Sequence, residues 1–478
     1  MKSLFTFLIG ITGAALCFSF AERASEKTPP LSFTIDTLAA NLYVPWDLTF
    51  IPDKTMLFTE RPGRVRLYRN NHLVEKPILI LDDVEVKGKM GLLGLCLHPG
   101  FAVNHFVYLA YNYRQGDRTF LRIARYRYGR DTLTDPKLII ENIPGVFNHT
   151  GSRLKFGPDK KLYITTGDAD VPQQSQDLKA LNGKILRLND DGGIPGDNPF
   201  VGSDTARHEI WTYGHRNPQG IAFQPGTGYL FESEHGPTGG DEINLIKKGH
   251  NYGWPLIHHK DTRPGMETPL LAFTPSIGPS EALFYSGRAF PSLKGNLLVA
   301  CLRGEAILRL QLAQQKIVSS EFLLKNKFGR IRALVEGPDG YLYISTSQID
   351  PPESNEAPGT NGVDLILRLR PAASLKDAIQ ANAIAAPAAA TASPHDRRPA
   401  TLYSQLCASC HGADLKGTTP AQNLVDSTWL HGSARPDLIR SIRSGIVAKG
   451  MPSWEGVLTD KEIGEMAEFI LQHKKGKS

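Results

Sequence analysis

The sequence predicts an all-β six-bladed propeller followed by a small all-α domain. The first observation is a repeat: between residues 32 and 371, six prolines in turns each come shortly before a strand-like run. They lie 47 to 67 residues apart, at Pro52, Pro99, Pro158, Pro225, Pro291 and Pro338. The second observation is that helical periodicity is almost absent from this region and appears only after residue 399.

A second strand-like run follows each of these prolines. The six runs are GRVRLYR (63–69), RIARYRY (122–128), GKILRLN (183–189), DEINLIK (241–247), AILRLQL (306–312) and DLILRLR (364–370). Six copies of a two-strand unit at about blade length predict a propeller, in which each blade buries its faces against its neighbours. A sandwich would not produce this period.

The N-terminus has the composition of a secretory signal. Lys2 precedes an apolar stretch at residues 4–18, and the sequence SFA at 19–21 is a small-x-small cleavage site. We therefore expect residues 1–21 to be a signal peptide that is cleaved on export to the periplasm, and no later stretch to span a membrane. The net charge is +6, and the lysines and arginines are scattered along the chain. A nucleic-acid-binding surface needs clustered cations, so we do not expect one here.

The region after the propeller changes character twice. Residues 372–398 are rich in Ala and Pro and contain no aromatic residue, which predicts a linker. Residues 399–478 then form the second domain, with helical segments expected at 399–412, 434–445 and 459–475. In the last segment, apolar residues recur at helical spacing, at Ile463, Met466, Ala467, Ile470 and Leu471.

The helical domain contains the motif CASCH at residues 407–411. A zinc site would need further soft ligands, but the domain offers only histidines at irregular spacing. A thioredoxin-like dithiol would need a βαβ setting, which is absent here. The motif therefore predicts one covalent haem c, attached through Cys407 and Cys410 with His411 as an iron ligand. Met451, in a loop between Gly and Pro, is the candidate sixth ligand. The domain thus resembles class I-type cytochromes c.

Several loops of the propeller region are dense in His, Arg, Asn and Asp. The runs are NHTGSRLKFGPDKKLYITTGD (148–168), YGHRNPQGIAF (213–223) and EHGPTGGDEINLIKKGHNYGWP (234–255). Such loops suit an anionic ligand and a titratable base. Together and in this order, they closely resemble the soluble aldose dehydrogenases that use pyrroloquinoline quinone (PQQ), the glucose/sorbosone dehydrogenase family. The resemblance covers about residues 35–370 and implies a six-bladed propeller, in agreement with the repeats.

The resemblance implies three catalytic residues. His149 matches the base that takes the proton from the sugar's anomeric hydroxyl while hydride passes from C1 to the quinone. Asp168 matches the carboxylate that orients this histidine. Arg216 matches the cation over the reacting quinone oxygen, where negative charge develops.

The resemblance also implies a cofactor site and a calcium site. Asn217 matches a cofactor contact, and Arg330 and Arg332 match two cations that bind its carboxylates. The backbone carbonyls of Gly236 and Pro237 match the calcium ligands, because calcium prefers hard oxygen donors. Residues that match nearby support for this loop are Asp241, Glu242 and Tyr252.

Two cofactor-site residues depart from the glucose enzyme of the family. Arg303 stands where that enzyme has a lysine, so the charge is kept but the geometry changes. Lys89 stands where it has a glutamine, which adds a cation beside the cofactor and leaves the role of this side chain open.

The expected function is oxidation of an aldose at C1, with electrons passing from PQQ to the haem of the same chain. An external cytochrome or another respiratory-chain acceptor would then oxidise the haem. One alternative is a calcium-dependent propeller hydrolase such as a lactonase, which has no need of a haem. Another is a propeller that has lost the cofactor and binds a ligand without catalysis. The presence of the whole set of site residues weighs against it: His149, Asp168, Arg216, Arg330 and Arg332. The sequence leaves the identity of the sugar open.

Overall fold

The structure is a computed structural model that describes residues 31–146, 148–237, 239–348 and 362–372, the pairs 379–380 and 384–385, and parts of 399–475. The predicted signal peptide (1–21) and Cys410 lie outside the described residues.

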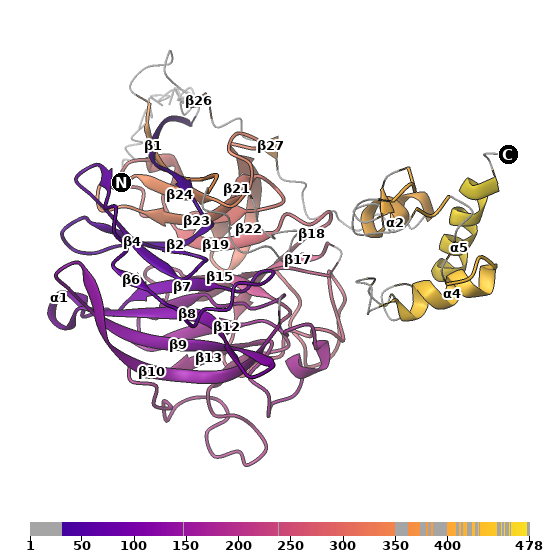
Figure 1. The fold of residues 1–478 in the computed structure, drawn as a ribbon, viewed down its shortest axis with the longest axis horizontal. Coiled ribbons are helices and arrows are strands. Elements are labelled where there is room, and N and C mark those ends of the chain that lie inside the picture. The colour runs from indigo at the N-terminus through magenta and orange to yellow at the C-terminus, as the bar shows by residue number, and fades with distance from the viewer. Residues whose placement is uncertain are drawn as a thin grey trace, which may run out of the picture.

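Six antiparallel sheets form the blades of a propeller, as predicted (Figure 1). The first strand of each blade contacts the first strands of both neighbouring blades, so these six strands form the inner ring. They are β2 (Pro45–Phe50), β7 (Leu92–Leu97), β11 (Leu154–Phe156), β15 (Pro218–Phe223), β19 (Pro279–Phe284) and β23 (Ile331–Glu336).

The two strand-like runs of each repeat are the second and third strands of the blades. The second strands are β3 (Met56–Glu60), β8 (Phe106–Gln115), β12 (Leu162–Thr166), β16 (Leu230–Glu234), β20 (Leu297–Cys301) and β24 (Leu342–Thr346). The third strands are β4 (Arg64–Arg69), β9 (Arg118–Gly129), β13 (Lys184–Leu188), β17 (Asp241–Ile246), β21 (Ala306–Ala313) and β25 (Asp364–Pro371).

The fourth strands lie at the outer side of each blade. They are β5 (His72–Leu73), β10 (Thr132–Gly145), β14 (Ile210–Tyr213), β18 (Leu271–Phe273), β22 (Lys316–Leu323) and β1 (Ser32–Leu42), and the short β6 (Leu79–Ile80) also pairs with β4. The N-terminal strand β1 closes the ring, because it pairs with β25 from Phe33 opposite Pro371 to Leu42 opposite Asp364. The N-terminal strand thus completes the last blade, and its pairing covers the edge of β25 that would otherwise be unpaired.

The apolar core lies between the blades. Strand β20 is buried along its whole length, because neighbouring blades cover both faces of its sheet. Leu298 packs on one side with Ile344, and Val299 packs on the other side with Phe231. This alternation follows from the two-residue period of a strand. A strand with both faces buried is apolar throughout, which explains why the middle strands stand out in the sequence.

A buried ionic cluster joins four of the inner strands. The guanidinium of Arg153, at the start of β11, lies 2.8 Å from the carboxylate of Asp47 on β2 and also pairs with Glu281 on β19. Its Nε donates to the carbonyl of Gln219 on β15 at 2.9 Å, and the ring of Trp46 lies 4.2 Å from it. Burial raises the pKa of Asp47 to about 7. Buried charges of this kind are tolerated because they are paired and hydrogen-bonded.

The segment predicted as a linker, 372–398, adds strands to two blades. β26 (Ile379–Gln380) pairs with β1, and β27 (Ile384–Ala385) pairs with β22. Two sheets therefore have a fifth strand that comes from this segment. Two short pieces of the predicted linker are therefore strands of the propeller sheets.

The C-terminal domain contains the described helices α2 (Pro399–Leu406), α4 (Arg435–Ser444) and α5 (Asp460–Lys475). The predicted apolar stripe of α5 is buried at Ile463, Met466, Ala467 and Ile470, while Leu471 is partly buried. These side chains form one core with residues of α2 and α4, such as Tyr403 and Leu438. Other short helices in the propeller are α1 (Phe101–Asn104), η1 (Pro172–Ser175) and η2 (Pro291–Leu293). Within the described ranges, no helix has the length and apolar character needed to cross a membrane.

Candidate active site

The loops at one end of the inner ring surround a cavity of about 180 Å³. Eight of the sequence-predicted site residues line it: Lys89, His149, Arg216, Gly236, Pro237, Arg303, Arg330 and Arg332. A larger hollow of about 430 Å³ lies at the turns that follow several first strands, beside residues such as Ile51, Phe101 and Pro338. None of the predicted site residues lines that second hollow.

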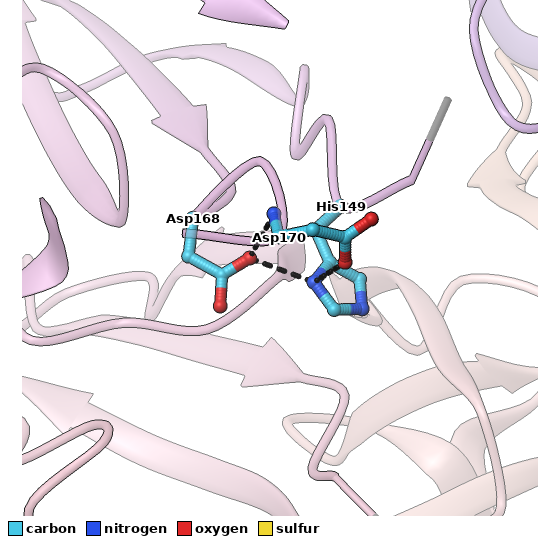
Figure 2. Close-up of side chains that lie close together, drawn as sticks. All are labelled: His149, Asp168 and Asp170. Atoms are coloured by element: carbon cyan, nitrogen blue, oxygen red, sulfur yellow. Dashed lines mark hydrogen bonds and ion pairs between the residues drawn. The ribbon is translucent and has the colours of Figure 1, made fainter. Parts of the chain in front are cut away.

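His149 and Asp168 form a buried pair beside the cavity (Figure 2). Nδ1 of His149 lies 2.7 Å from Oδ1 of Asp168, which follows β12. The other carboxylate oxygen of Asp168 accepts a hydrogen bond of 2.8 Å from Nε1 of Trp254. Because each carboxylate oxygen of Asp168 has its own hydrogen-bond partner, the carboxylate is fixed and holds the imidazole in one orientation. Nε2 is then the ring nitrogen that Asp168 does not contact.

The surroundings keep the imidazole neutral. Burial and the positive charge of Arg216 lower the pKa of His149, and the two nearby carboxylates of Asp168 and Asp170 only partly oppose this. Burial acts to raise the pKa of Asp168, but its hydrogen bond with His149 and the charge of Arg216 leave that pKa lowered overall. A neutral imidazole beside an ionised carboxylate can accept a proton near neutral pH.

Arg216 is positioned by its own backbone. Its N–H donates to Oε2 of Glu234 at 2.7 Å, and its carbonyl accepts a hydrogen bond of 2.8 Å from the N–H of Asp168. The guanidinium lies 5.4 Å from the ring of Trp254 and donates to the carbonyl of His235 at 3.2 Å. The same backbone therefore places both the cation and the carboxylate behind His149.

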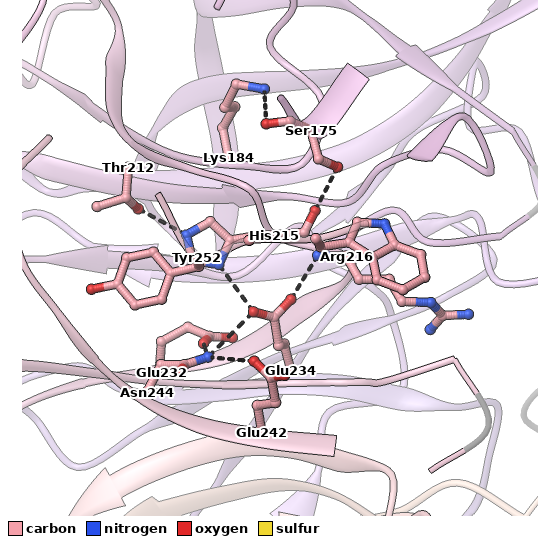
Figure 3. Close-up of polar contacts among 12 residues, drawn as sticks. Ser175, Lys184, Thr212, His215, Arg216, Glu232, Glu234, Glu242, Asn244 and Tyr252 are labelled. Atoms are coloured by element: carbon pink, nitrogen blue, oxygen red, sulfur yellow. Dashed lines mark hydrogen bonds and ion pairs between the residues drawn. The ribbon is translucent and has the colours of Figure 1, made fainter. Parts of the chain in front are cut away.

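A buried polar network contacts this backbone from two sides, with Ser175 on one side and Glu234 on the other (Figure 3). His215 lies 3.1 Å from Glu234 through Nδ1 and 2.9 Å from the hydroxyl of Thr212 through Nε2. Its ring stacks on that of Tyr252, with the ring centroids 4.7 Å apart. Its carbonyl accepts a hydrogen bond of 2.7 Å from the hydroxyl of Ser175. His215 and Glu234 therefore position the backbone of Arg216. Sequence reasoning missed both residues, although His215 is adjacent to Arg216 and Glu234 lies two residues before Gly236.

Two further parts of the network involve buried charges. The ammonium of Lys184 donates to the carbonyls of Gln174, Ser175 and Asn182, at 2.7, 3.1 and 2.7 Å. The amide of Asn244 donates to three carboxylates, those of Glu232, Glu234 and Glu242. Burial and repulsion from Glu234 raise the pKa values of Glu232 and Glu242 well above the usual range. The predicted support residue Glu242 thus belongs to this cluster.

The cavity gathers positive charge. Burial and the charges of Arg216, Arg303 and Arg332 lower the pKa of Lys89 to about 7. Burial and the charge of Arg303 lower the pKa of Arg330 to about 10. Arg332 is 3% exposed and donates to Oε1 of Gln219 at 2.6 Å. Cations that depress one another's pKa in this way form a site for an anion with several negative charges.

The loop with the predicted calcium ligands is held in shape by Asp241. Its Oδ1 accepts a hydrogen bond of 2.9 Å from the N–H of Gly236, and its Oδ2 accepts hydrogen bonds of 2.7 Å from the N–H groups of Ile277 and Gly278. Burial raises the pKa of Asp241. A Cβ on Gly236 would overlap carbonyl oxygens of the same loop. The packing of this loop therefore requires glycine at position 236, beside the carbonyls that are the predicted calcium ligands.

Asn217 and Tyr252 lie away from the cavity wall. Oδ1 of Asn217 accepts a hydrogen bond of 3.1 Å from the N–H of Gly151, while its buried Nδ2 has no hydrogen-bond partner among the described residues. A buried donor of this kind is uncommon in a folded protein. The phenol of Tyr252 donates to the carbonyl of Leu245 at 2.7 Å, so it supports the end of β17.

Two described residues of the CASCH motif, Cys407 and His411, contact each other in the helical domain. The N–H of His411 donates to the carbonyl of Cys407 at 2.8 Å. Met451 pairs through its backbone with Ile446. Cys407 and Met451 both pack against the domain core, which includes the buried Trp454.

Comparison with known proteins agrees with this arrangement. Residues 42–352 match the family described as glucose/sorbosone dehydrogenase, and residues 394–470 match the family described as cytochrome c oxidase, cbb3-type, subunit III. The aldose sugar dehydrogenase YliI of Escherichia coli is 34% identical over 352 residues, which cover 70% of this chain and 94% of the relative. Quinoprotein glucose dehydrogenase B of Acinetobacter calcoaceticus is 35% identical over 268 residues, or 50% of this chain and 54% of the relative.

A solved structure extends the likeness to three dimensions. The PQQ-bound aldose sugar dehydrogenase of Streptomyces coelicolor is 30% identical, with a TM-score of 0.61, over 72% of this chain and 100% of that one. The chain therefore belongs to the glucose/sorbosone dehydrogenase family, with a cytochrome c domain following the propeller.

Proposed function

We propose that the propeller oxidises aldose sugars at C1 with PQQ and calcium bound in the cavity, and that the electrons pass to a covalent haem c of the same chain. The observation that carries this proposal is the meeting of two features in one cavity. A buried, neutral His149 is held by a carboxylate, and several cations surround the space beside it. A base and an anion site together suit proton removal next to an anionic cofactor.

The side chains present fit the cofactors that the family uses. Arg303, Arg330 and Arg332, with Lys89, would bind the three carboxylates of PQQ, and the free amide of Asn217 would offer a further hydrogen bond. The carbonyls of Gly236 and Pro237 would bind calcium. Bound PQQ supplies a two-electron acceptor for the hydride from C1, and calcium supplies a Lewis acid that polarises it.

The chain's own residues supply the acid–base chemistry. Nε2 of His149 accepts the proton of the C1 hydroxyl, because Nδ1 is engaged with Asp168. Asp168 stabilises the positive charge that the ring then acquires. The guanidinium of Arg216 is a fixed positive charge at the cavity wall, where negative charge develops during the reaction. The buried surroundings strengthen both effects.

The cytochrome domain would take up the electrons. Cys407 and Cys410 would attach the haem, with His411 and Met451 as the two iron ligands. A His/Met pair raises the haem potential, which suits an electron acceptor. A cleaved signal peptide would place the protein in the periplasm, where an external cytochrome or another respiratory-chain acceptor would oxidise the haem.

The experiment follows the haem absorption bands of the full chain. The protein is reduced with ascorbate, reoxidised, supplied with calcium and PQQ, and then given a panel of aldoses. We expect sugar to reduce the haem only when both additions are present. If no aldose reduces the haem of the loaded protein while the propeller hydrolyses lactones or only binds ligands, the proposal is wrong. The variant His149→Gln should abolish the reduction while the haem spectrum stays unchanged.

A further inference from the structure

A second carboxylate contacts the imidazole of His149. Oδ1 of Asp170 lies 3.1 Å from Nδ1 of His149, the nitrogen that Asp168 contacts at 2.7 Å (Figure 2). The side chains of His149 and Asp168 are 8% and 0% exposed, whereas that of Asp170 is 36% exposed. One carboxylate thus lies beneath the ring nitrogen in the protein interior, and the other approaches it from the side of the solvent.

Asn148 connects Asp170 to the far side of the ring. Its amide nitrogen donates to Oδ1 of Asp170 at 3.1 Å and lies 3.2 Å from Nε2 of His149. The side chains of Asn148 and Asp170 therefore contact both nitrogens of the imidazole.

The backbone is shaped to bring Asp170 to this position. The N–H of Asp170 donates to Oδ1 of Asp168 at 2.9 Å, so the two carboxylates are joined through the chain itself. The φ angles of Ala169, Asp170 and His149 are 51°, 57° and 47°. Left-handed backbone is unfavourable for residues other than glycine and is concentrated at functional sites.

We propose that Asp170 is a second carboxylate for His149: it positions the ring together with Asp168 and stabilises the positive charge that the ring acquires when it takes a proton. The inference rests on the proposed function, in which His149 is the base. A hydrogen bond to a charged group is stronger than one between neutral groups. Because Asp170 is partly exposed, water weakens its effect, which is therefore smaller than that of Asp168.

The charges around His149 determine the sign of the expected change. Asp168 and Asp170 favour the protonated ring, while burial and Arg216 favour the neutral ring. Removal of the charge of Asp170 therefore lowers the pKa of His149 further.

The test is the variant Asp170→Asn in the full chain loaded with PQQ and calcium. We expect the acidic limb of the kcat/KM profile to move to lower pH, because the base loses its proton more readily. The plateau of kcat should fall by roughly tenfold, because the charged ring is less well stabilised. The matched control is Asp177→Asn on the same loop, where the side chain is exposed and its Oδ1 accepts a hydrogen bond from the N–H of Lys179. Asp177→Asn should change neither limb nor plateau.

A second measurement separates this inference from the proposed function. NMR of the reduced full chain with labelled histidine reports the titration of His149, identified by the signal missing in His149→Gln. In Asp170→Asn this titration should move to lower pH whether or not the protein oxidises sugar. A shifted titration in a protein that oxidises no aldose would keep the contact and reject the function. An unchanged titration and an unchanged pH profile would overturn the inference.

Discussion

The protonation state of Lys89 depends on what is bound in the cavity. Its pKa is lowered to about 7 by burial and by Arg216, Arg303 and Arg332. A bound anion offsets these charges and raises the pKa again. Above pH 7, the empty cavity thus holds a largely neutral Lys89, and PQQ binding should draw a proton from solution.

This expectation can be measured by titration calorimetry at pH 8. The heat of PQQ binding should differ between phosphate and Tris, with the sign expected when the protein takes up a proton from the buffer. The affinity for PQQ should fall as the pH rises above 7. The variant Lys89→Gln, which has no charge to gain, should show a smaller difference between the two buffers. Equal heats for the natural chain would contradict the prediction.

The candidate site could be predicted in part at the level of single residues. His149 and Arg216 stand in motifs, NHTG and GHRNP, whose residues match a known family position by position. Asp170 carries no such signal, because an aspartate after a strand is most often a turn residue, and its contact with His149 depends on a left-handed turn. Lys184 lies within the strand pattern GKILRL. This pattern gives no sign that the ammonium of Lys184 donates to the carbonyls of Gln174, Ser175 and Asn182.

The loop between β16 and β17 is the element on which the predicted calcium site depends. A Cβ at Gly236 would overlap the carbonyl oxygens of Gly239 and Gly240. In Gly236→Ala the loop must therefore shift to separate the new Cβ from these two carbonyl oxygens, and the predicted calcium ligands shift with it. A misplacement of about 1 Å in a site can lower activity by about 10²-fold. The rate of PQQ-dependent sugar oxidation, measured against calcium concentration, should fall accordingly and require more calcium.

The control for this loop is Gly196→Ala. A Cβ at Gly196 meets no atom within 4 Å, and its backbone has no positive φ. The control should have the activity of the natural chain. If both variants lost the same activity, the packing of the loop would not be the cause.

The elements could be predicted where both faces of a strand are buried. The second strands appear in the sequence as apolar runs after a proline turn, and the third strands as the strand-like runs that follow them, in several of which arginine alternates with apolar residues. The fourth strand β5 has two residues and the first strand β11 has three, which is too short for any periodicity. β26 and β27 lie in an Ala-rich segment, where pairing depends on the outer edges of β1 and β22 and not on their own residues.

The repeat predicts the whole propeller, but the sequence does not show what holds the blades together at the ring. Arg153 is 1% exposed and bridges Asp47, Gln219 and Glu281 from three other blades. In Arg153→Met the carboxylate of Asp47 would stay buried without the cation that pairs with it, and Glu281 would keep only the partly exposed Lys155, 3.4 Å away. Removal of one partner from a buried ionic cluster costs about 3–5 kcal/mol.

The unfolding of the propeller by urea measures this cost. Arg153→Met should lower the free energy of unfolding by about 3–5 kcal/mol. Arg114→Met is the matched control, because the side chain of Arg114 is 57% exposed and lies 4.0 Å from Asp117. Its effect should stay below about 1 kcal/mol. Similar losses in the two variants would show that the cluster does not join the blades.

The pairing of β27 with β22 also limits how far the cytochrome domain can lie from the propeller. β27 ends at Ala385 and α2 begins at Pro399, so 13 residues lie between the edge of one blade and the cytochrome domain. A chain of that length spans at most about 50 Å even when fully extended. The cytochrome domain therefore stays within that distance of the end of β27. In the proposed relay, electron transfer from the cavity to the haem would then occur within one molecule, at a rate that does not change when the protein is diluted.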